Sequence, residues 1–147
     1  MMPTMADPTP QHVRQLRLVV TATDFDAAVA FYRDALGMVE AQAVSSPGGR
    51  IVILDAGRAT LELVDAAHAA YIDEVEVGRR VAGPIRVAFE VDDSAAMTDR
   101  LAEAGGTVIA PPTLTPWRSR NARLDGPDLQ LTLFTEPPDE PPPTRAD

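Results

Sequence analysis

Two arginines, a glutamate and a threonine stand at equivalent positions of two similar stretches of the chain. Arg17 and Arg86 lie 69 residues apart, each as the second residue of an apolar run, and Glu62 and Thr132 lie 70 residues apart in two later runs. The planar fork of an arginine suits a carboxylate, phenolate or carbonyl oxygen, and a glutamate in a dry cleft can act as a general base. Together these side chains predict a pocket that holds a polar small molecule.

A structural alternative stays open for the same charges. The two arginines can instead pair with Glu62 and Glu90, because buried charges need partners and hydrogen bonds. In the functional interpretation, one arginine keeps part of its hydrogen-bonding capacity for an anionic ligand, or a glutamate receives a cationic group. The residue types do not decide between the two.

The elements that would position these residues begin with a β-α-β-β-β order. The run at 16–20 is rich in β-branched residues and predicts a strand. Asp24 can cap a helix whose apolar residues recur at helical spacing, and Gly37 can end it. Further strands are predicted next to the turn sequences SSPGG and AGR, at 38–44, 50–55 and 59–64.

The same order returns in the second half of the chain. A strand at 85–91 precedes a helix over 94–104, which Asp93 can cap and Gly105-Gly106 can stop. Asp24 and Asp93 are again 69 residues apart, as are Gly37 and Gly106, and a constant offset of this kind indicates duplication. Three strands follow, at 107–110, 119–125 and 129–134. We therefore predict an α+β fold of two tandem βαβββ modules, at residues 15–65 and 84–135.

Both ends of the chain and the segment between the modules depart from this pattern. Residues 1–14 and the proline-rich residues 136–147 are expected to be disordered, because they bury too little apolar surface to offset the cost of ordering. Residues 66–83 form a linker, whose charged DEVEVGRR stretch predicts a short helix or a solvated face. The remaining length suffices for one core, so residues 15–135 are predicted to form a single domain.

Charge and composition exclude several classes of function. The net charge of −9 opposes binding to phosphate backbones, which needs a surplus of Lys and Arg, so no nucleic acid partner is expected. The chain has no cysteine, which excludes thiolate catalysis and cysteine-bound zinc. No apolar run approaches the ~20 residues of a membrane span. We expect a cytoplasmic protein without membrane partners.

Strand periodicity separates the side chains that face the helices from those on the concave face. Residues i and i+2 of a strand share a face, so the apolar residues beside Arg17 and Arg86 are assigned to the helices. The opposite face, together with the tryptophan of the TLTPWRSRN loop, gives the predicted ligand pocket. Its residues are Arg17, Val19, Thr21, Thr60, Glu62, Arg86, Ala88, Glu90, Trp117, Gln130, Thr132 and Phe134.

Aromatic and histidine side chains receive separate expectations. Trp117 is the single tryptophan, and its polar loop suits stacking on a flat ligand as well as a structural role. Tyr71 is expected either to line a dimer groove or to cover the core. His12 and His68 lie outside the predicted strands and are expected to be exposed to solvent.

Two sets of motifs carry a family resemblance over about residues 15–135. They are VVTATDFDAAVAFYRDALGM in the first half, and IRVAFEVDD, AEAGGT and LDGPDLQLTLF in the second. With them the chain resembles the vicinal oxygen chelate superfamily, which includes glyoxalase I, extradiol dioxygenases and bleomycin-resistance proteins. The resemblance implies paired βαβββ modules whose curved mixed sheets form a half-barrel cleft, commonly in a homodimer.

The resemblance also assigns a metal site, which the residues of this chain do not suit. Metal-dependent relatives hold His, Glu, His and Glu, or close substitutes, at the positions of Arg17, Glu62, Arg86 and Thr132. Arginine has donors and no usable lone pair, so only Glu62 can serve as a strong ligand. We therefore expect no metal and no other cofactor.

The resulting functional hypothesis is a small-molecule binding protein similar to the metal-free bleomycin-resistance proteins. It would sequester a drug or natural product, aromatic or anionic, in clefts of a homodimer. The alternative is an enzyme, namely a glyoxalase-like lyase or isomerase or a dioxygenase, either metal-dependent or using Glu62 as a general base. Whether the protein catalyses a reaction is left open by the sequence.

Overall fold

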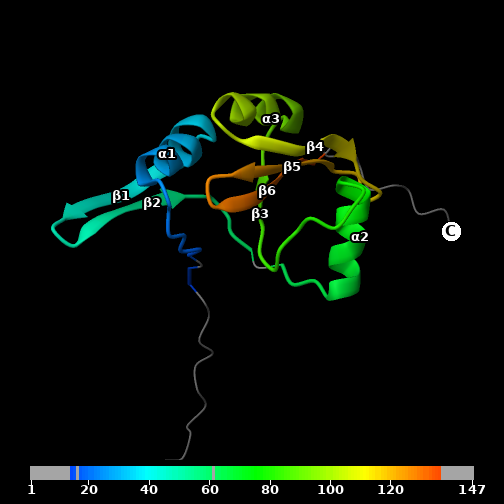
Figure 1. Ribbon diagram of the computed structural model, residues 1–147, viewed down its shortest axis with the longest axis horizontal. Helices are drawn as coiled ribbons and strands as arrows, with labels where there is room; N and C mark the ends of the chain where they lie inside the picture. Colours follow the sequence, from blue (N-terminus) through cyan, green and yellow to red (C-terminus); the bar gives the residue numbers. More distant parts are fainter. Residues whose placement is uncertain (1–13, 16, 61, 137–147) are drawn as a thin grey trace, which may run out of the picture.

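The computed structural model describes residues 14–15, 17–60 and 62–136 (Figure 1). The two terminal segments expected to be disordered lie almost entirely outside these ranges. None of the helices in the described ranges has the length and apolar character needed to cross a bilayer.

A four-stranded mixed sheet dominates the described structure. Its strand order is β3-β6-β5-β4, with β3 parallel to β6 and the other neighbours antiparallel. Together with α3 (Ser94–Glu103), these strands give the second half its β-α-β-β-β order. The sheet is open and does not close into a barrel (Figure 1). The strands are β3 (Val87–Glu90), β4 (Thr107–Leu114), β5 (Arg120–Gly126) and β6 (Leu129–Thr135).

The first half forms a smaller sheet than the sequence predicts. Its only strands in the described residues are the antiparallel pair β1 (Val39–Ser46) and β2 (Gly49–Asp55), close to two of the predicted strands. The described parts of 16–20 and 59–64 form no strand, so those two predictions are corrected. Within the part of the chain that the structure describes, neither segment has a neighbouring strand to satisfy its backbone groups, and Val19 and Leu63 are 86% and 84% exposed. The tandem modules and the half-barrel cleft therefore stay predictions.

Asp24 and Asp93 cap the two predicted helices in the same way. The Asp24 carboxylate accepts a hydrogen bond from the backbone N–H of Ala27 at 3.0 Å, and Asp93 accepts one from Ala96 at 3.0 Å. Each cap satisfies one of the backbone donors that a helix start leaves unpaired. The capped helices are α1 (Phe25–Val29), which continues as the π-helix η1 (Ala30–Ala35), and α3.

The ends of these helices differ by one residue. The glycines with left-handed backbone are Gly37, at φ +90°, and Gly105, at φ +106°. The predicted equivalence of Gly37 with Gly106 is therefore corrected. A π-helical turn is one residue wider than an α-helical turn, and the Leu36 N–H indeed bonds the carbonyl of Phe31 across such a turn. The extra residue of the first helix is held in η1.

One apolar core joins the first helix to the second sheet. Phe31 and Tyr32 of η1 pack with Leu101 of α3 and with the sheet residues Ala122, Leu124, Leu131 and Leu133. The Tyr32 hydroxyl donates a hydrogen bond to the Pro127 carbonyl, and burial raises the pKa of this phenol. Because side chains alternate along a strand, the face of the sheet opposite this core is the one that carries Arg123 and Thr132. That second face is contacted by the remaining helix, α2 (Ala66–Glu76).

Candidate functional site

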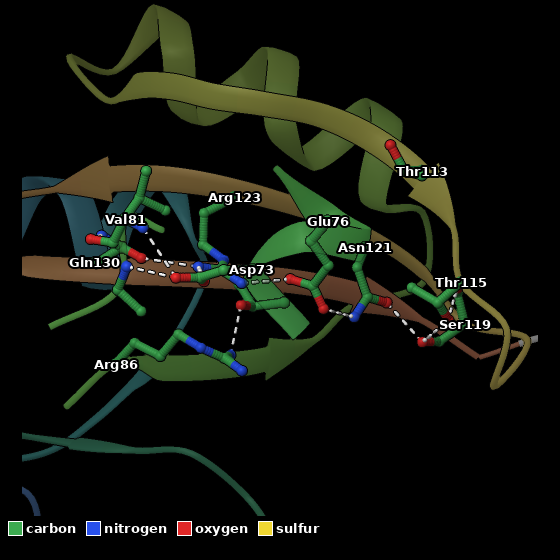
Figure 2. A network of polar contacts seen from close by, with 12 residues as sticks. Asp73, Glu76, Val81, Arg86, Thr113, Thr115, Ser119, Asn121, Arg123 and Gln130 are labelled. Carbon is green, nitrogen blue, oxygen red and sulfur yellow. Dashed lines mark hydrogen bonds and ion pairs between the residues drawn. The ribbon is translucent and has the colours of Figure 1, made fainter. Parts of the chain in front are cut away.

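A fully buried arginine fastens α2 to the sheet. Arg123 of β5 is 0% exposed, and its two terminal nitrogens form ion pairs with Asp73 at 2.7 Å and Glu76 at 2.8 Å (Figure 2). Both carboxylates come from the inner side of α2 and are themselves buried. Buried charges of this kind are tolerated only when they are paired and hydrogen-bonded. The solvated face expected for the charged linker is therefore wrong for these two residues.

Asp73 also fixes the chain that follows α2. Its second carboxylate oxygen accepts hydrogen bonds from Arg80 at 2.8 Å and from the backbone N–H groups of Val81 and Ala82 at 2.9 and 3.0 Å. Burial alone would raise the pKa of Asp73, but these backbone hydrogen bonds and the Arg123 guanidinium outweigh it and lower that pKa. The segment that Asp73 holds leads directly to Arg86.

The network continues from Glu76 along the same face of the sheet. Asn121 donates to Glu76 at 2.8 Å, and the Ser119 hydroxyl donates to Asn121 at 2.6 Å (Figure 2). This network was not predicted from the sequence. Its signals were the i, i+3 spacing of Asp73 and Glu76 on a helix and the i, i+2 spacing of Asn121 and Arg123 on a strand.

Of the four positions predicted to converge, Arg86 and Thr132 are in contact. The Arg86 guanidinium donates to the Thr132 hydroxyl at 2.7 Å (Figure 2). Burial, and secondly the nearby charge of Arg123, lowers the pKa of Arg86, although an arginine that starts above ~12 keeps its charge at neutral pH. Within the described ranges, Arg86 forms no ion pair with any carboxylate.

Glu62 and Arg17, the other two of the four positions, form no hydrogen bond or ion pair with Arg86 or Thr132 among the described residues. Glu62 interacts electrostatically with Arg86 and is exposed, so the dry setting that a general base needs is not found around it. Arg17 is exposed, and its only hydrogen bond with a described residue goes to Gln15. Neither glutamate of the structural alternative, Glu62 or Glu90, forms an ion pair with either arginine among the described residues.

The other predicted pocket residues fall into two groups. Gln130 belongs to the network, since it accepts from Arg123 at 3.0 Å and donates to the Val81 carbonyl at 3.2 Å, and Phe134 is half-buried on β6. The second group is exposed and outside the network: Val19, Thr21, Thr60, Ala88, Glu90 and Trp117. His68 is exposed as expected, and His12 lies outside the described residues.

An open groove lies beside α2. Its volume is about 610 Å³, and it is lined by residues 62–65 and by Ala67, His68 and Tyr71. The Tyr71 ring centroid lies 5.9 Å from that of His68 and 6.2 Å from that of Trp117, which stands in the turn between β4 and β5. Glu62 joins the groove to the neighbourhood of Arg86.

A model of the glyoxalase/bleomycin resistance protein/dioxygenase superfamily matches residues 12–139. The chain belongs to this superfamily. Its fold is similar to that of several solved structures, whereas no curated protein gives a significant match.

Three of these structures illustrate the similarity. A protein of unknown function from Agrobacterium tumefaciens is 20% identical, with a TM-score of 0.58 over 88% of this chain and 98% of its own. A superfamily member from Sphaerobacter thermophilus is 24% identical, with a TM-score of 0.54 over 88% and 100%. A glyoxalase-related enzyme from Fulvimarina pelagi is 18% identical, with a TM-score of 0.52 over 88% and 94%. At these identities the similarity concerns the fold alone.

The side chains at the four positions that the resemblance assigns to a metal do not fit a divalent ion. The Arg86 guanidinium donates a hydrogen bond to Thr132 and has no lone pair for a metal. Its positive charge would also repel a divalent ion. Glu62 is then the one strong oxygen ligand among the four positions, whereas protein metal sites use three or four. Among the described residues, no three His, Asp or Glu side chains gather closely enough to hold a metal ion.

Proposed function

We propose that the protein binds a small molecule without a metal and sequesters it, as the bleomycin-resistance members of the superfamily do. The observation that carries this proposal is Arg86. Its guanidinium is half-buried, is positioned by Thr132, and has no carboxylate partner within the described ranges. A cation in this state is suited to an anionic or carbonyl oxygen of a ligand.

The charge balance of the network supports this role for Arg86. Asp73 and Glu76 form their ion pairs with Arg123 and Arg80, so they attract Arg86 through space but do not occupy its guanidinium. The positive charge of Arg123 also disfavours a second cation nearby, which a bound anion would relieve. A ligand oxygen at Arg86 would therefore remove an unfavourable interaction as well as form a charge-assisted hydrogen bond.

A second copy of the chain completes the proposed binding protein. Residues 17–20 and 62–64 contain apolar side chains that one copy leaves exposed, among them Val19 and Leu63, and such patches are characteristic of protein interfaces. Arg17 and Glu62 lie on these segments, so the cleft would be completed by dimerisation. Light scattering coupled to gel filtration should give twice the chain mass, and Val19→Asp should shift it to the monomer. A monomer before substitution would contradict the homodimer.

The binding proposal is tested by ligand titration and metal analysis. Trp117 is the single tryptophan and its ring lies beside that of Tyr71, so its fluorescence reports on ligands that reach this part of the surface during titration with a panel of aromatic and carboxylated natural products. We expect saturable binding that Arg86→Gln weakens at least about tenfold, as for a lost charged hydrogen bond, with Arg50→Gln as an exposed control. Stoichiometric Ni, Zn, Fe or Mn in protein purified without chelator would overturn the metal-free proposal.

A further inference from the structure

The groove beside α2 is negative in sign. Among the described residues, the charged side chains that line it are Glu62 and Asp65, and none of its described lining residues is a lysine or arginine. Asp65 uses one carboxylate oxygen to cap α2, through a 2.8 Å hydrogen bond from the His68 N–H. Glu62 has no hydrogen bond or ion pair with any residue in the described part of the chain. The net charge of −9 adds long-range attraction for cations.

Two exposed aromatic rings lie at the groove: Tyr71 belongs to its lining, and Trp117 lies next to Tyr71 just outside the lining. The buried side of α2 consists of Ile72, Asp73 and Glu76. Tyr71 lies on the outward side of the helix and is 47% exposed. Trp117 is 43% exposed even though its ring contacts that of Tyr71. Large aromatic surfaces that are fixed and exposed favour stacking, because little conformational entropy is lost when a ligand binds.

The turn that carries Trp117 is also fixed. The Thr115 N–H bonds the Ser119 carbonyl at 2.9 Å, and the Arg118 N–H bonds the Thr115 carbonyl at 2.9 Å. Ser119 in turn belongs to the network that runs through Asn121 to Glu76. The buried network therefore sets the positions of both rings, Tyr71 through α2 and Trp117 through the turn.

We infer that the groove binds a flat aromatic group that carries a positive charge. The ring stacks on Tyr71 and Trp117, where a cation also gains from the negative faces of the aromatic rings, and the charge lies close to Glu62. This inference rests on the proposed function and specifies the part of the ligand that lies away from Arg86. Arg86 offsets part of this attraction, because it interacts electrostatically with Glu62, but it does not belong to the groove lining, where Glu62 and Asp65 are exposed.

Three probes with one ring system test the inference. N-methylquinolinium, quinoline and quinoline-6-carboxylate differ in charge at neutral pH and have similar ring areas. In calorimetric titrations of the full chain, N-methylquinolinium should bind about tenfold more tightly than quinoline, and quinoline-6-carboxylate should bind most weakly. Added salt should weaken the binding of N-methylquinolinium and leave the binding of quinoline unchanged.

Matched variants locate the site. Glu62→Gln should weaken N-methylquinolinium about tenfold and leave quinoline unchanged, whereas Tyr71→Leu should weaken both probes. The control is Glu74→Gln, which removes the same charge from an exposed position of α2 outside the groove and should change neither affinity. Equal losses in Glu62→Gln and Glu74→Gln would overturn the inference, because they would indicate general attraction by the net charge.

Other outcomes separate this inference from the proposed function. If quinoline-6-carboxylate binds most tightly and loses affinity in Arg86→Gln, the cationic preference is overturned and the binding role of Arg86 stands. If N-methylquinolinium shows no saturable binding at millimolar concentration, the inference is overturned, and the natural-product titration alone decides the proposed function.

Discussion

Ion pairs of equal length occupy different surroundings in the two halves of the chain. In the first half, Arg50 approaches Asp26 to 2.7 Å at the surface, and its guanidinium also lies over the ring of Phe25. In the second half, Arg123 approaches Asp73 to the same distance with both side chains buried. The exposed pair competes with water and salt, whereas the buried pair leaves an uncompensated charge when one member is removed. The burial of an ion pair, and not its N–O distance, therefore decides how much stability is lost when one member is removed.

Apolar surface is distributed unevenly as well. The second half buries Leu131 and Leu133 of β6 completely in the core shared with α3. The first half leaves Val19 and Leu63 almost fully exposed and places Phe31 and Tyr32 of η1 on the second sheet. The second half therefore contains most of the order, and the first half depends on contacts with it and, as proposed, with a second copy.

The largest effect is expected from breaking the buried network. Arg123→Met leaves the buried carboxylate of Glu76 without an ion-pair partner and leaves Asp73 with the half-exposed Arg80 alone, which should lower the free energy of unfolding by about 3–5 kcal/mol. Arg50→Met breaks the surface pair of equal length and should cost under about 1 kcal/mol. Urea unfolding followed by circular dichroism measures both. Similar losses in the two variants would mean that burial does not distinguish the halves.

Gly126→Ala should weaken the packing of the first helix on the second sheet, with a smaller effect on the free energy of unfolding. A Cβ at this position would lie 2.9 Å from both the Phe31 ring and the Tyr32 hydroxyl oxygen, and the backbone of Gly126 itself is ordinary. Overpacking of this kind costs about 1–3 kcal/mol. Hydrogen exchange should show faster exchange in α1 and η1 than in the sheet. Gly83→Ala, with no atom within 4 Å of its Cβ, is the control and should leave stability unchanged.

Acid should weaken the second half through Asp73. The pKa of Asp73 is lowered from its usual 3.8 in the folded protein, so unfolding takes up a proton at low pH. The stabilisation is present above pH ~4 and is lost as the pH falls through the folded pKa. Asp73→Asn should be less stable at pH 6, and its stability should change less between pH 5 and 3. Asp34→Asn is the first-half comparison: the pKa of Asp34 is also lowered, but solvent screens its exposed pair with Arg33, so a smaller change is expected.

Local features could be predicted from the sequence, and most distant partners could not. The helix caps and the strands at β5 and β6 follow from residue type and periodicity over short stretches, whereas the contact of Arg86 with Thr132, 46 residues away, was predicted from the repeat of the two halves. The Arg123 network depends on residues 47 to 50 positions away along the chain, whose meeting is set by where α2 packs. Residues 17–20 have the composition of a strand, but a strand also requires a neighbour, which no described segment of the chain supplies.

The smallest effect should be the same in both halves. Asp24 and Asp93 cap their helices through hydrogen bonds of identical length, 3.0 Å, to the backbone three residues on. Replacement of either by alanine removes one such bond, which costs about 1 kcal/mol. If the halves fold as one cooperative unit through the Phe31 core, Asp24→Ala and Asp93→Ala should lower the free energy of unfolding equally in urea. If the first half instead unfolds before the second, Asp93→Ala alone should shift the main transition, and Asp24→Ala should shift an earlier one, which would show that the shared core does not couple them.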